Sequence, residues 1–71
     1  METMRNEIIK ASIMHFEAHI KKHVVNVENL MMNTVGVSEH PDIMDTIEKE
    51  LAVIADYDDK LSVLKKYFED N

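Results

Sequence analysis

Three of the four histidines in this chain recur every four residues, at His15, His19 and His23. On a helix, residues four apart lie on one face, and two such imidazoles can chelate a divalent metal ion. We therefore take these three histidines as candidate metal ligands. The alternative interpretation is a line of surface or interface histidines. If they pair with acidic side chains of a second helix below their ordinary pKa of about 6.5, we expect association to depend on pH.

Other patterns in the sequence argue against an enzyme. The chain has no Glu-x-x-His or His-Glu-x-x-His motif, which di-iron bundles and zinc proteases use. The acidic run Asp56-x-Asp58-Asp59 lacks the central glycine and the distal glutamate of a calcium loop. There is no cysteine, no glycine-rich phosphate loop, and no serine or threonine in a nucleophile motif. We expect no catalytic residue and no cofactor.

The histidines fall within a long amphipathic segment that we expect to be helical over about residues 3–35. Apolar residues recur there at spacings of three and four, which is typical of a core-facing stripe. The stripe consists of Ile9, Ile13, Phe16, Ile20, Val24, Val27, Met31 and Val35. A second apolar line, interrupted by Lys21 and Glu28, consists of Ala11, Met14, Ala18, Val25 and Met32. Two stripes indicate either two neighbours in the folded protein, or one neighbour and a weakly apolar exposed side.

A turn is expected at the middle of the chain, over residues 36–40. Gly36, the sole glycine, suits the position after a helix end, and Pro41, the sole proline, suits the first turn of the next helix. A helix, a short polar link and a second helix predict an antiparallel αα-hairpin that forms a single domain over residues 1–71. In such a hairpin, facing positions add up to about 76, which places His19 beside Tyr57 and His23 beside Val53.

The second helix is expected over about residues 41–69. Its apolar stripe consists of Ile43, Ile47, Leu51, Ile54, Leu61, Leu64 and Phe68. Because aspartate is a poor helix former and a good helix cap, the run Asp56–Asp59 is the point where this helix could break. The alternative architecture is therefore a three-helix form with a break near Asp56–Asp59.

A pair of helices buries only one line of contact, and a core of 71 residues without disulfides needs further support. We expect a second copy of the hairpin to complete a homodimeric four-helix bundle. The expected function is a non-enzymatic structural or protein-interaction module that self-associates through apolar helix faces and can present its surface to a larger protein. The expected interface residues are Met14, Ala18, Val25, Met32, Phe16, Ile20, Ile54 and Leu61.

The charge is distributed unevenly along the chain. Residues 1–35 are neutral, and residues 36–71 carry the whole net charge of -6, which disfavours nucleic-acid binding. Two alternative functions follow from the residues: a metal-binding bundle that uses His15, His19 and His23, and an acidic mimic of nucleic acid. No run of about 18 apolar residues is present, so we expect no membrane span and a cytoplasmic location.

One resemblance extends over nearly the whole chain. The segment Val35-Gly36-Val37-Ser38-Glu39-His40-Pro41-Asp42-Ile43-Met44, followed by the acidic helix and Lys65-Lys66-Tyr67-Phe68, resembles short helical proteins of tailed marine cyanophages. That resemblance implies a small viral accessory or structural protein located in the cytoplasm of the host cell. It implies no particular activity and no site residues.

Overall fold

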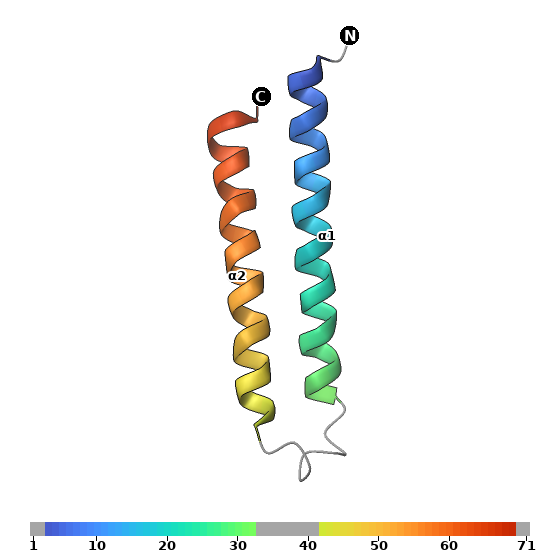
Figure 1. Ribbon diagram of the computed structural model, residues 1–71, viewed down its shortest axis with the longest axis vertical. Helices are drawn as coiled ribbons and strands as arrows, with labels where there is room; N and C mark the ends of the chain where they lie inside the picture. The colour runs from blue at the N-terminus through green and yellow to red at the C-terminus, as the bar shows by residue number, and fades with distance from the viewer. Residues whose placement is uncertain (1–2, 33–41, 70–71) are drawn as a thin grey trace.

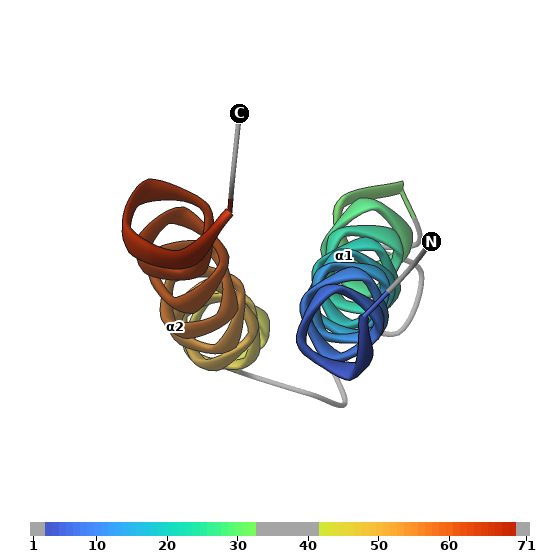
Figure 2. The same cartoon turned by 90° about the horizontal axis from the view of Figure 1, so that it is seen from above.

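The computed structural model describes residues 3–32 and 42–69, and these residues form two α-helices and no strand. Helix α1 runs from Met4 to Met32, and helix α2 runs from Ile43 to Phe68. The helices lie side by side and antiparallel, so the start of α1 and the end of α2 lie at the same end of the molecule (Figure 1). Seen from above, the described helices form a single layer (Figure 2). The predicted all-α hairpin is therefore confirmed.

Side-chain caps mark the start of each helix. The backbone N–H of Asn6 donates to Oγ1 of Thr3 over 3.1 Å. Likewise, the backbone N–H of Asp45 donates to Oδ1 of Asp42 over 2.8 Å. These bonds satisfy N–H groups that have no partner inside the helix. Helix α2 thus begins at Ile43, about two residues later than expected, and the predictions for Gly36, Pro41 and the connector lie outside the described residues.

Replacing the cap of α2, Asp42→Ala, is expected to destabilise the hairpin by about 1 kcal/mol, because the N–H of Asp45 then loses its acceptor. Thermal unfolding followed by circular dichroism measures this change. The control is Asp59→Ala, which removes an exposed aspartate inside α2 and should change stability little. An equal loss in both variants would show that charge, not capping, accounts for the effect.

Helix α2 continues without a break through Asp56–Asp59, so the three-helix alternative is not the observed architecture. Within this run, Nζ of Lys60 donates to Oδ2 of Asp56 over 2.9 Å, along the same face of the helix. Asp58 and Asp59 are exposed, so their charges remain in water. The low helix propensity of aspartate amounts to less than about 1 kcal/mol per residue. The half-buried residues Ile54 and Leu61, before and after the run, hold α2 on α1.

The predicted apolar stripe of α1, which includes Val27, faces the predicted apolar stripe of α2, but the core between the two helices is thin. Val27, with 8% of its surface exposed, is the one buried residue in the described part of the chain. Most other members of the stripes are half-buried. Three members lie at the edge of the contact and are exposed, namely Met31 at 57%, Leu51 at 50% and Phe68 at 52%. A single helix–helix contact is therefore narrower than the apolar stripes that it covers.

Candidate functional site

The three candidate metal ligands occupy different environments along α1. His15 is exposed, whereas His19 and His23 are half-buried beside α2. The rings of His15 and His19 meet edge to face, with centroids 4.4 Å apart. His19 also stacks on Tyr57 of α2, with centroids 4.8 Å apart and an interplanar angle of 18°. The predicted pairing of His19 with Tyr57 is confirmed, and the hairpin has the register expected from the sequence.

Tyr57 is the centre of an aromatic cluster at the middle of the hairpin. Its ring lies 6.0 Å from that of Phe16 and 6.4 Å from that of His15, measured between centroids. On its own helix, Nζ of Lys60 lies 5.2 Å from the centroid of the same ring, within the range of a cation–π interaction. Contacts of this kind between rings contribute about 0.5–1.5 kcal/mol beyond their buried area. Tyr57 therefore joins the two helices more extensively than a single contact would.

His23 forms the second polar contact between the helices. Its Nδ1 donates to Oε2 of Glu50, and the side-chain amide of Asn26 donates to Oε1 of the same carboxylate over 3.3 Å. The side chains of His23 and Glu50 are 17% and 21% exposed, so this pair is largely shielded from water. Polar groups that face each other at one register position fix how the two helices align. In a register shifted by one turn, His23 and Glu50 would no longer face each other.

This arrangement uses the imidazoles for contacts between side chains. Within residues 3–32 and 42–69, no three His, Cys, Asp or Glu side chains are grouped in a way that could hold a metal ion. His15 and His19 contact aromatic rings, and His23 is engaged by a carboxylate. The chemistry that the geometry supports at this position is therefore recognition between helices.

The pKa of His19 is lowered from its ordinary value, first by partial desolvation beside α2 and then by the positive charges of His15, Lys22 and His23. The group that faces His19 from α2 is Tyr57. Above pH 6.5 the imidazole is neutral in both the folded and the unfolded chain. Below pH 6.5 the unfolded chain binds the proton more readily, so the free energy of unfolding falls as the pH falls toward the lowered pKa.

We therefore expect His19→Phe, which keeps a ring against Tyr57 but cannot titrate, to weaken the dependence of stability on pH. Urea unfolding of both proteins at pH 7.5 and pH 5.5 measures the difference. The wild-type protein should lose more stability on acidification than the variant does. Parallel losses in the two proteins would contradict this role of His19.

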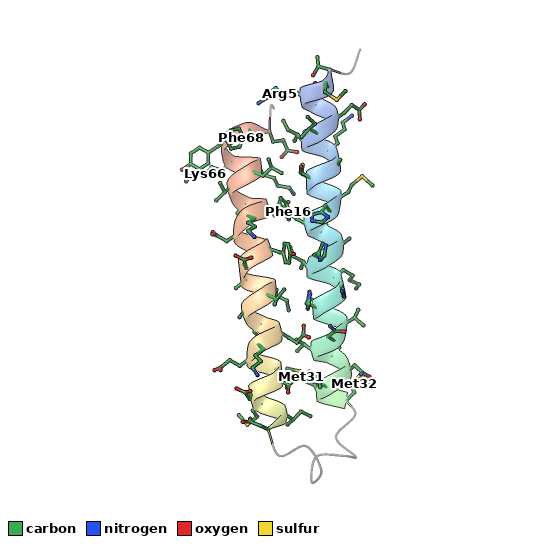
Figure 3. The ribbon with its side chains drawn as sticks, viewed as in Figure 1. Arg5, Phe16, Met31, Met32, Lys66 and Phe68 are labelled. Carbon is green, nitrogen blue, oxygen red and sulfur yellow. The ribbon has the colours of Figure 1, made fainter. Side chains whose placement is uncertain are left out.

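A separate contact closes the open end of the hairpin. An Nη2 group of Arg5 donates to the backbone carbonyl of Phe68 over 2.8 Å, and both residues lie at the end that carries the termini (Figure 3). The last carbonyls of a helix carry partial negative charge, so the guanidinium stabilises the end of α2. Beside this bond, Ile8, Ile9 and Leu64 line an open apolar hollow together with Arg5 and Phe68.

The predicted interface residues separate into two groups in the structure. One group takes part in the contact between α1 and α2 and is half-buried: Phe16, Ile20, Ile54 and Leu61. The other group is exposed: Met14, Ala18, Val25 and Met32. In the latter, Met14 is 69% exposed, Val25 is 52% exposed and Met32 is 77% exposed. The spacing of four residues between Phe16 and Ile20, and of seven between Ile54 and Leu61, indicates packing within the hairpin. The structure does not bring the two groups together.

Some residues that join the helices were missed from the sequence. Glu50 and Asn26 carried no motif, although the expected register placed His23 beside Val53, one helical turn from Glu50. A carboxylate within one turn of a facing histidine is the signal that could have found this pair. The bond from Arg5 to the carbonyl of Phe68 depends on where α2 ends, so the sequence offered no comparable signal for it.

Comparison of the chain with known protein families, with curated proteins and with solved structures gives no match. In the described part of the chain, neither helix is long and apolar enough to cross a membrane.

Proposed function

We propose that this chain is a non-enzymatic structural or interaction module that self-associates, with two hairpins forming a four-helix bundle. The resemblance to cyanophage proteins extends the proposal to an accessory protein that acts in the host cytoplasm and presents its outer surface to a larger protein. The self-association is supported by one observation in particular, the large apolar surface that a single hairpin leaves in water.

The hairpin exposes more surface than a compact monomer of its mass would. The hairpin exposes 5737 Å², whereas a typical monomeric protein of 8.3 kDa exposes about 4,600 Å². The excess of roughly 1,100 Å² exceeds the area of about 800 Å² that each partner buries in a standard interface. The large apolar residues on this surface are Met4, Ile8, Met14, Val25, Met31, Met32, Met44, Leu51, Val63, Tyr67 and Phe68. A second copy supplies a matching apolar surface of the same size.

Thermal unfolding at several protein concentrations tests this proposal. If folding is coupled to dimerisation, the midpoint temperature rises as the concentration rises, because mass action favours the associated state. We expect a clear increase between about 2 and 200 μM when the helical signal is followed by circular dichroism. A midpoint that does not change over this range, with full helical content, would contradict the proposal.

A further inference from the structure

The two long sides of the hairpin differ in chemistry. One side carries the polar contacts described above, and we call it the histidine side: His15, His19, Asn26, Glu50 and Tyr57. These contacts show which side of α1 and which side of α2 belong to the same surface of the molecule. The other flank of α1 and the other flank of α2 therefore lie together on the surface opposite the histidine side.

On α1 that opposite surface is apolar from Ile13 to Met31, and on α2 it is apolar from Met44 to Leu51, whereas farther along α2 the same flank carries Asp58, Ser62 and Lys65. We call the apolar part the apolar face: Ile13, Ile20, Val24, Met31, Met44, Ile47 and Leu51. At 100° per residue, its members on α1 fall within about 40° of one another and lie about 140° around the helix from His15, His19 and Asn26. On α2, its members lie about 110° from Tyr57. None of these seven residues is charged, and Met31, Met44 and Leu51 are 57%, 78% and 50% exposed.

We infer that a second copy of the chain docks on the apolar face, and this inference rests on the self-association proposed above. Docking there brings the second pair of helices against both α1 and α2. Ile20, Val24 and Ile47, which are half-buried in one hairpin, then become part of an enclosed core. The hairpin as a whole exposes roughly 1,100 Å² more than a compact monomer of its mass, and each partner in a standard interface buries about 800 Å².

The other surfaces suit a second copy less well. The exposed line on α1, with Met14, Val25 and Met32, is interrupted by Lys21 and Glu28 and lies on the side opposite α2. A second copy docked on this exposed line would contact α1 alone and would leave the half-buried residues between α1 and α2 accessible to water. The outer side of α2 carries more acids than bases, with Asp45, Glu48, Asp56 and Asp59 against Lys49 and Lys66. Two copies of that side would repel each other.

Two variants with matched exposure distinguish the apolar face from the outer line of α1. Leu51 lies on the apolar face and is 50% exposed, and Val25 lies on the outer line and is 52% exposed. By two-fold symmetry, Leu51→Glu places two carboxylates in the interface, so we expect the dissociation constant to rise at least about 100-fold. For Val25→Glu, we expect a change of less than about threefold. Sedimentation equilibrium over a range of concentrations measures both constants.

A second pair of variants, Met44→Glu and Met32→Glu, distinguishes weaker dimerisation from unfolding of the hairpin. Met44 on the apolar face is 78% exposed and Met32 on the outer line is 77% exposed, so neither side chain contributes much to its own hairpin. We expect Met44→Glu to weaken the dimer and Met32→Glu to leave it intact. The inference is overturned if Val25→Glu and Met32→Glu are the disruptive variants, or if all four variants dimerise like the wild type. A monomeric wild-type protein would instead overturn the proposed function itself.

Discussion

Replacing Val27 with aspartate is expected to unfold the hairpin. Val27 is the most buried residue that the structure describes, with 8% of its surface exposed. A carboxylate at this position loses most of its water and gains no designed partner, and such a charge destabilises a fold by about 3–5 kcal/mol. That loss equals the stability that a core of this size usually supplies. The helical signal of Val27→Asp should therefore fall to that of an unfolded chain.

The matched control is Val25→Asp, which makes the same chemical change two residues earlier. Val25 is 52% exposed, so its aspartate remains in water and we expect a loss of less than about 1 kcal/mol, mostly from helix propensity. Circular dichroism and urea unfolding of the two variants measure the difference. If both variants remain equally folded, the contact between α1 and α2 does not stabilise the helices as described.

Removing the ring of Tyr57 is the second large change, and we expect Tyr57→Ala to destabilise the hairpin by about 2–3 kcal/mol. The ring contacts both helices, since it stacks on His19 and lies near Phe16 and Lys60. The variant loses the buried aromatic area and leaves a gap between the helices. We place the value below that of a fully buried aromatic residue because Tyr57 is half-buried.

Tyr67 provides the control for this change. It is 65% exposed, and Nζ of Lys66 on the same helix lies 5.3 Å from the centroid of its ring. We expect Tyr67→Ala to change the free energy of unfolding by less than about 0.5 kcal/mol. Because alanine is the better helix former, helix propensity alone would give a gain, so equal losses from Tyr57→Ala and Tyr67→Ala would show that the aromatic cluster does not determine the effect.

The helices could be predicted because the spacing of apolar residues records which side of a helix is covered. The spacing placed α1 and α2 close to their observed bounds, and the antiparallel register followed from a turn near the middle of the chain. The pairing of His19 with Tyr57 was accessible for the same reason. The continuity of α2 through Asp56–Asp59 was the preferred prediction, because the apolar stripe kept its phase across the aspartates.

The polar contacts between the helices and the exposure of the stripe residues depend on distances between side chains, which the spacing of apolar residues in the sequence does not predict. A long carboxylate side chain can reach a full turn along the neighbouring helix, so Glu50, one turn from Val53, forms the polar contact with His23. The exposure of Met31 and Leu51 depends on the width of the contact between two cylinders, which is smaller than the width of the stripe. For the candidate site, spacing aligned the three histidines on one helix but could not show that each one has a different neighbour.

The two sides of the hairpin have separate roles in this account. The histidine side holds α1 and α2 in register through Tyr57 and Glu50. The apolar face, formed by the opposite flanks of the same helices, remains available for a second copy. Because the titrating imidazole of His19 lies on the other side, acidification should act on the stability of each hairpin before it acts on the interface.

The mass of the protein in solution tests self-association most directly. Sedimentation equilibrium at about 50 μM and neutral pH should return roughly 17 kDa, twice the chain mass of 8.3 kDa, and the mass should fall toward that of one chain on dilution. A mass of one chain at every concentration, with both helices intact, would contradict the account.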